Sequence, residues 1–180
     1  KEIMAYELES VRTQGMDLTV VTDSIAVTSI IPLSEVKVHL NVDFNDSDAK
    51  ITELLKSAFR EVELFTQKSL KTKTVRQSYV EINGTIELAY TPVQSVISVT
   101  DSNLVVLTDY TTSFDLTKFS AYSASGIVIT YTAGYSSLPA DIKNAILDIV
   151  AVDYDDTVAD KRLALKEVKD RIRHYRPMYV

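Results

Sequence analysis

The sequence of 180 residues contains no cysteine. This absence excludes disulfide bonds, thiolate nucleophiles and every metal site that depends on cysteine ligands. Only four glycines are present, and Gly15, Gly84, Gly126 and Gly134 lie far apart. The phosphate-binding loops of P-loop and Rossmann enzymes need clustered glycines, because the backbone must approach the phosphate closely. The sequence therefore excludes nucleotide-binding enzymes of those types.

Long hydrophobic runs are also missing. No apolar segment reaches the roughly 18 residues that a membrane-spanning helix needs. No apolar segment typical of a signal peptide follows the charged start of the chain at Lys1 and Glu2. We therefore expect neither a membrane contact nor a signal peptide. The length suits one domain that buries its own hydrophobic core.

Charge is distributed unevenly along the chain. The formal net charge is −6, but residues 161–180 carry seven Lys or Arg and two acids, so that this segment is +5 and residues 1–160 are −11. An acidic body argues against a body surface that grips nucleic-acid phosphates. The basic segment could instead dock on an acidic partner, or contact nucleic acid by itself.

Candidate catalytic residues are scattered rather than clustered. The only histidines are His39 and His174, at distant positions in the sequence, and a lone histidine on an amphipathic helix is typical of a packed or solvated side chain. The many acids offer carboxylate pairs, but none lies in a motif that points to a reaction. We therefore predict a protein that is not an enzyme and needs no cofactor.

The acid-rich segment at residues 43–48 resembles the start of a calcium-binding EF-hand loop. The match fails further on, because Asp48 replaces the glycine at the sixth position and Leu54 replaces the glutamate at the twelfth. Capping of the following helix by Asp46 or Ser47 explains these residues better. The acids between Asp153 and Asp160 are interpreted as a solvated turn, so no metal site is predicted.

The first 31 residues are predicted to form an N-terminal extension, an arm that packs on its own domain or on a neighbour. Residues 18–22 and 26–31 within it are rich in Val, Ile and Thr, which favours β-strands. Ser34, just after Pro32, is a good N-cap for a short helix. A longer helix is predicted to run to about Lys68, with apolar positions at helical spacing: Ile51, Leu54, Leu55, Ala58, Val62 and Phe65.

The period of the apolar positions then changes to two, which predicts a small antiparallel sheet. Residues 75–82 and 85–88 flank Asn83-Gly84, a strong signal for a hairpin turn. Further strands are predicted at residues 93–100 and 127–132, around an irregular aromatic segment at residues 104–125.

Two predicted helices close the chain, one beginning near Pro139 and one running from Asp160 to Tyr175. The fold class is therefore α+β: mainly helical, with about four helices and a small antiparallel sheet inserted between the second and third. The expected organisation is an arm at residues 1–31, a central domain at residues 32–158 and a basic C-terminal helix and tail at residues 159–180.

Four segments in this order resemble the head–tail connector family of tailed bacteriophages, also called adaptor or head-completion proteins. They are residues 32–43 (PLSEVKVHLNVD), 90–96 (YTPVQSV), 130–135 (TYTAGY) and 138–147 (LPADIKNAIL). The resemblance covers roughly residues 32–155. It implies a structural virion protein, made in the cytoplasm of a bacterial host, that assembles during head completion into a ring of often twelve copies beneath the portal.

Such a ring extends the DNA channel and presents a platform for the next connector, stopper or tail protein. The acidic body fits a channel wall along which DNA slides without specific binding.

The C-terminal segment is the candidate partner interface, toward the portal or an adjacent subunit. Leu165, Val168, Ile172 and Tyr175 form a narrow apolar seam, and Arg171, Arg173 and Arg176 lie beside it. Met178 and Tyr179 extend the interface into the tail. The alternative is that the seam packs on the protein's own core.

Three other functions stay open at this point. A tail-terminator or stopper protein is disfavoured by the helical content, because those proteins are dominated by β structure. A nucleic-acid-binding module would act through the basic helix. An enzyme without a familiar motif would need a deep polar pocket.

Overall fold

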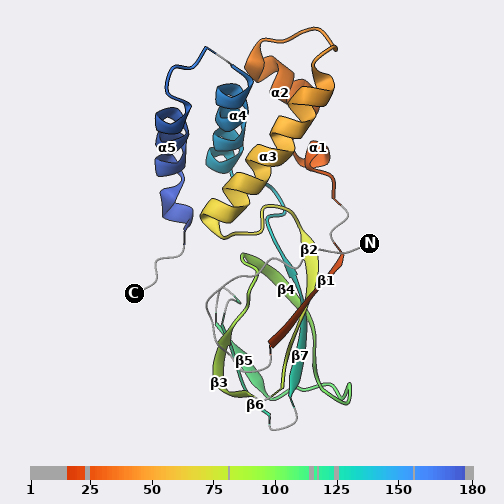
Figure 1. Cartoon of the computed structure of the whole chain (residues 1–180). Helices are drawn as coiled ribbons and strands as arrows, with labels where there is room; N and C mark the ends of the chain where they lie inside the picture. The colour runs from red at the N-terminus through yellow and green to blue at the C-terminus, as the bar shows by residue number, and fades with distance from the viewer. Residues whose placement is uncertain are drawn as a thin grey trace.

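A computed structural model describes residues 16–22, 25–80, 82–113, 116, 118–123, 126–155 and 157–176. The helices gather at one end of the molecule and the strands at the other, so that a helical lobe stands on a β lobe (Figure 1). The helices are α1 (Val27–Ile30), α2 (Leu33–Leu40), α3 (Asp48–Thr66), α4 (Ala140–Tyr154), α5 (Lys161–Arg171) and the 3-10 helix η1 (Arg173–Tyr175). The strands are β1 (Met16–Thr22), β2 (Lys73–Tyr79), β3 (Ile82–Glu87), β4 (Val93–Asp101), β5 (Tyr110–Thr112), β6 (Lys118–Ser123) and β7 (Ile127–Ala133).

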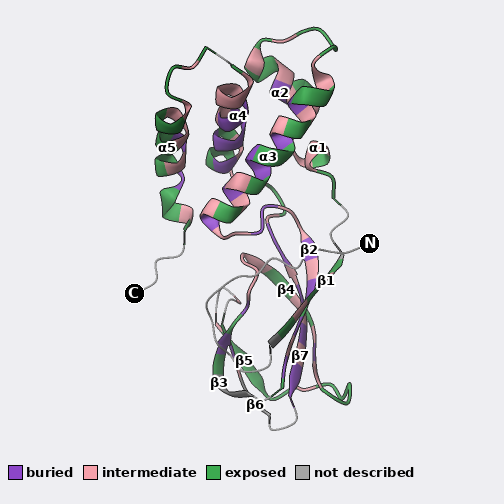
Figure 2. Ribbon diagram, in the orientation of Figure 1, coloured by how far each residue is buried: buried purple, intermediate pink, exposed green. Residues whose placement is uncertain are grey.

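The helical lobe is built around α3 and α4, which pack against each other, while α5 packs on α4. The predicted apolar stripe of α3 faces inward: Ile51, Leu55 and Val62 are fully buried. They meet the stripe of α4, including Ile142 and Ile146, in one core (Figure 2). The helical spacing of these side chains thus explains both why the segments are helical and which faces they bury.

The β lobe contains two antiparallel sheets, with strand orders β1-β2-β7-β4 and β3-β6-β5. Alternate residues of β7 are buried, from Ile127 through Ile129 and Tyr131 to Ala133, as a strand with one face on a core requires. Phe119 of β6 joins the same core. The α+β prediction is confirmed, although the β structure is larger than the single small sheet expected.

A buried polar network lies inside this β core. The Tyr131 hydroxyl donates to Gln77 Oε1 at 2.9 Å, and the same oxygen accepts from the backbone N–H of Ala89 at 3.1 Å. Gln77 Nε2 also contacts the Tyr79 hydroxyl. Because a buried polar group without a partner is costly, this network fixes how β2 and β7 face the segment that follows β3.

Several predicted elements are wrong in detail. Asn83-Gly84 makes no hairpin turn back to β2, because both edges of β2 are already occupied by β1 and β7. The two residues lie inside β3, which pairs with β6 instead. Residues 26–31 contain helix α1 rather than a strand, and the supposedly irregular segment at residues 104–125 contains β5 and β6.

Other boundaries differ less. Pro32, not Ser34, is the N-cap of α2, and no side-chain hydrogen bond caps this helix. Proline suits the start of a helix because the N–H that it lacks would have no intrahelical partner there. The strand predicted at residues 18–22 is confirmed as β1, and it pairs with β2 along the edge of the larger sheet. Part of the predicted arm is thus built into the β lobe.

Candidate assembly surfaces

Helix α5 is fixed at its start by Asp160, whose Oδ1 accepts a hydrogen bond from the backbone N–H of Leu163 at 3.0 Å. This is the N-cap that an aspartate provides well. The apolar seam of α5 packs against the helical core of the protein itself. Val168 is only 6% exposed and Ile172 only 1%, while Leu165 and Tyr175 pack partly buried against the same core. The burial that was expected against a partner is therefore supplied, for these four side chains, within the chain.

The cations of this segment are oriented by contacts to α3 and α4. Arg171 forms an ion pair with Asp148, and the same carboxylate lies 3.2 Å from His39 Nε2. Lys169 Nζ lies 2.6 Å from Glu61 Oε1. These pairs tie α2, α3 and α5 together around α4.

Arg171, Arg173 and Arg176 remain exposed. Met178 and Tyr179 lie outside the described residues. A partner interface at α5 therefore stays a prediction, and in this conformation its exposed cations are the groups that can carry it.

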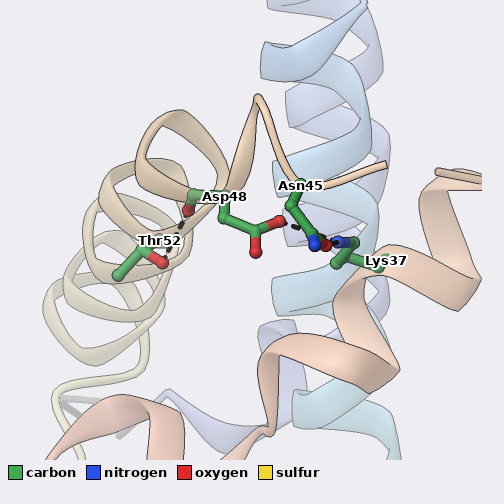
Figure 3. A network of polar contacts seen from close by, with 4 residues as sticks. All are labelled: Lys37, Asn45, Asp48 and Thr52. Atoms are coloured by element: carbon green, nitrogen blue, oxygen red, sulfur yellow. Dashed lines mark hydrogen bonds and ion pairs between the residues drawn. The ribbon is translucent and has the colours of Figure 1, made fainter. Parts of the chain in front are cut away.

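The loop between α2 and α3 is held by a single lysine (Figure 3). Lys37 Nζ donates to Asn45 Oδ1 at 2.7 Å and to Asp48 Oδ1 at 2.8 Å. The Thr52 hydroxyl donates to the carbonyl oxygen of Asp48 at 2.8 Å. Ser47 is the N-cap residue of α3, as predicted, but its side chain makes no capping hydrogen bond.

This anchoring leaves an aromatic side chain projecting from the loop. Phe44 is 50% exposed, and both Asp43 and Asp46 beside it are exposed. We refer to residues 43–46 as the acidic loop. Two of the side-chain oxygens in the segment that resembles a calcium loop accept hydrogen bonds from Lys37. Within the described ranges, no group of three or more His, Cys, Asp or Glu could hold a metal ion.

The two lobes meet at a pocket of about 280 Å³. Its walls come from the second half of α3, the segment that follows it, α1 and the chain after β3. Five of the lining side chains are basic, namely Lys56, Arg60, Lys68, Lys71 and Lys73, and Glu63 is the one acid among them. We call this cavity the junction pocket.

The deep side of the junction pocket is ordered by Glu63 and Lys73. Glu63 Oε1 accepts from the backbone N–H of Leu70 at 3.0 Å and lies 3.9 Å from Lys73 Nζ. Lys73 is 8% exposed, and its ammonium lies 4.2 Å from the centre of the Tyr90 ring, a distance typical of a cation–π contact. The outer rim carries Leu64, which is 61% exposed.

This pocket is not predicted from the sequence. The apolar stripe of α3 predicts which face of the helix is buried, but not that Lys56, Arg60 and Glu63 on its polar face line a pocket. The signal was present in the string Lys68–Lys73, where three lysines fall within six residues. Its meaning depends on the fold, because Tyr90 and Ala89 reach the pocket from beyond β3.

An exposed apolar turn forms a further surface at the far end of the β lobe. Leu104, Val105 and Val106 are three consecutive exposed apolar residues after β4. Asp101 Oδ1 accepts from the backbone N–H groups of Asn103 and Val105, both at 2.8 Å, and so shapes the turn that precedes these residues. A contiguous exposed apolar surface of this kind is typical of a protein–protein contact.

Local contacts order the acids in the last turn of α4 and in the turn that follows it. Hydrogen bonds from the hydroxyl and backbone N–H of Thr157 hold the pKa of Asp155 below its usual range. Partial burial, with Glu61 nearby, raises the pKa of Asp153. Within the part of the chain that the structure describes, no helix is long and apolar enough to cross a membrane.

Comparison with protein families matches residues 29–163 to the head completion protein family, HCP. The chain belongs to the head completion protein family. This confirms the family predicted from the four sequence segments. Family membership makes this head completion protein a structural head–tail connector, in a family of structural virion proteins rather than of enzymes. No curated protein matches the chain.

Solved structures share the fold of this head completion protein. A chain from the "neck of empty GTA particle computed with C6 symmetry" is 22% identical, with a TM-score of 0.68, over 91% of this chain and 97% of that chain. A chain from the virion of a native gene transfer agent (GTA) particle is 21% identical, with a TM-score of 0.66, over 91% of this chain and 96% of that chain. A chain from the neck of a native GTA particle computed with C12 symmetry is 21% identical, with a TM-score of 0.66, over 91% of this chain and 97% of that chain.

Proposed function

We propose that this head completion protein forms a closed ring that binds the portal on one side and the next connector, stopper or tail protein on the other. The family match over residues 29–163 carries the proposal. The similarity to chains in necks computed with C6 and with C12 symmetry supports a ring, for which we propose twelve copies. In this role the protein acts without catalysis, at the head–tail interface of a virion, after synthesis in the bacterial host cytoplasm.

The surfaces described above supply what a ring subunit needs. The acidic loop, the junction pocket and the apolar turn at Leu104–Val106 are separate surfaces on different elements. A ring subunit must contact two neighbours through different surfaces, because head-to-tail contacts join two unlike patches. Closure repeats each contact around the ring, so that interfaces of modest area suffice.

The basic surface of α5 is the proposed contact to the portal. Arg173 and Arg176 are exposed and lie on η1 and at its end, where they can pair with acids of a partner. Arg176 also lies 5.9 Å from the centre of the Phe65 ring. The formal charge of −11 on residues 1–160 supports a channel wall that DNA passes without specific binding.

Portal binding tests this assignment. The double variant Arg173→Glu and Arg176→Glu should bind the cognate portal about tenfold more weakly or worse, because charge reversal at an interface introduces repulsion as well as losing attraction. Arg76→Glu is the control, because it makes the same Arg-to-Glu charge reversal at an exposed position of β2, away from α5. Unchanged portal affinity in the double variant would remove α5 from the portal contact.

The same variants distinguish a nucleic-acid function. A protein that binds DNA through the basic helix would show salt-dependent DNA affinity that the double variant loses. The ring assignment predicts weak DNA binding that does not depend on these two arginines.

A further inference from the structure

We infer that the acidic loop of one copy fills the junction pocket of the next copy in the ring. This inference rests on the proposed ring function and adds to it the pair of surfaces that joins neighbouring subunits.

The junction pocket has the chemistry of a receptor for an acidic segment with an apolar tip. Its five lining cations outnumber the one lining acid, in a chain whose net charge is −6. Two of these cations also have acidic neighbours within the chain, since Lys56 pairs with Glu53 at 2.8 Å and Lys73 lies 3.9 Å from Glu63. Apolar side chains lie between these cations, including the exposed Leu64 on the rim and Val27 of α1. A cleft that binds only phosphate gains nothing from apolar lining residues, whereas a docked peptide loop can bury its apolar side chains against them.

The acidic loop has the complementary chemistry. Phe44 projects from it at 50% exposure, between the exposed carboxylates of Asp43 and Asp46. Aromatic side chains, Phe among them, are enriched at protein–protein interfaces, where they bury a large apolar area. Lys37 holds the loop through Asn45 and Asp48 (Figure 3), so little conformational entropy is left to lose on docking.

The two surfaces belong to different copies because they are separated along the same helix. The acidic loop precedes α3, whereas the pocket is lined by its second half. From Asp48 at the start of α3 to the lining residues Arg60 and Leu64, the helix rises roughly 18–24 Å at 1.5 Å per residue. A patch that fits a distant patch on an identical molecule makes a head-to-tail contact, which closes into a ring when the rotation permits.

Cyclic symmetry adds a geometric consequence. Neighbours in a ring are related by rotation alone, so contacting patches of successive copies lie at the same height along the ring axis. Because the patches are separated along α3, this helix should run around the circumference of the ring rather than along the DNA channel.

The absence of cysteine permits a direct test by disulfide trapping. Phe44→Cys protein is mixed with Leu64→Cys protein under assembly conditions with the cognate portal, and then oxidised. A docked loop brings the two Cα atoms within the few ångströms that a disulfide requires, so a cross-linked dimer is expected. The control is Phe44→Cys mixed with Val80→Cys, a similarly exposed apolar position in the β lobe, which should stay uncross-linked.

Charge reversal provides the second measurement. Arg60→Glu should weaken self-association at least tenfold, measured by mass photometry against concentration, and Asp46→Lys should do the same. Combining both changes in one chain restores an opposite pair at each interface and should recover most of the association. Arg76→Glu should associate like the unchanged protein, and thermal melting of each variant separates lost assembly from lost folding.

The outcomes are distinguishable. Rings that form with a Phe44–Leu64 cross-link and with mutual rescue support the inference. Rings that form without that cross-link overturn the inference and leave the proposed function standing. If the protein stays monomeric with the portal, both fall. If Arg60→Glu assembles normally but loses DNA affinity, the pocket is a nucleic-acid site and the inference is wrong.

Discussion

Replacing Ile172 by alanine tests whether the seam of α5 belongs to the core of the protein. Ile172 is 1% exposed and packs in the helical core. Truncation of a buried isoleucine removes apolar contacts and leaves a cavity, at a cost of about 2–5 kcal/mol. For a chain of this length the melting temperature should fall by roughly 4–20 °C, since each kcal/mol corresponds to about 2–4 °C.

The assay is urea unfolding of the isolated protein followed by circular dichroism, with thermal melting as a second probe. Leu163→Ala is the matched control, because Leu163 lies on the same helix but is 52% exposed. Its free energy of unfolding should stay within about 0.5 kcal/mol of the unchanged protein. If Ile172→Ala behaved like Leu163→Ala, α5 would not be packed on its own domain in solution, and the seam would be free for a partner.

Three further predictions concern the lobe junction and the β core. Gly134→Ala should strongly destabilise the protein, with a large fall in melting temperature, because Gly134 has a φ of +110° and a Cβ would lie 2.1 Å from the carbonyl oxygen of Lys71. Gln77→Leu should cost about 1–3 kcal/mol in urea unfolding, because the Tyr131 hydroxyl loses its buried acceptor. Burial raises the pKa of both Tyr79 and Tyr131. In alkaline titration at 295 nm these two should therefore ionise after the exposed tyrosines. Because their folded pKa is raised, their contribution to stability is complete below about pH 10, the unfolded value, and is lost as the pH rises above it. An unfolding free energy that did not fall above that pH would contradict this assignment.

Sequence patterns predicted the longer helices of the helical lobe because each carries its own periodic signal, whereas the four-residue α1 is too short to show one. The stripe from Ile51 to Phe65 identifies α3, and Asp160 marks the start of α5. Such signals are local: three or four residues suffice to define a face and a cap. The sequence does not decide whether Val168 and Ile172 are buried against the protein's own core or against a partner. An apolar seam predicts that these side chains are buried, but it does not identify the surface that covers them.

The β lobe was harder to predict because strand pairing is not local. Asn83-Gly84 favours a hairpin only if the neighbouring strand has a free edge, and β1, from residues before α1, already occupies that edge of β2. The junction pocket was missed for the same reason. Its cations lie on α3 and on the segment that follows α3, whereas Tyr90 comes from the chain after β3. Only the folded chain brings these segments together.

The mass of the purified protein in solution, alone and mixed with the cognate portal, tests the central claim most directly. Light scattering measures it without labels and across a range of concentrations. We expect a closed ring of many copies, either alone or on the portal, with a copy number near twelve. A protein that remains a monomer at all concentrations and leaves the mass of the portal unchanged would contradict the account.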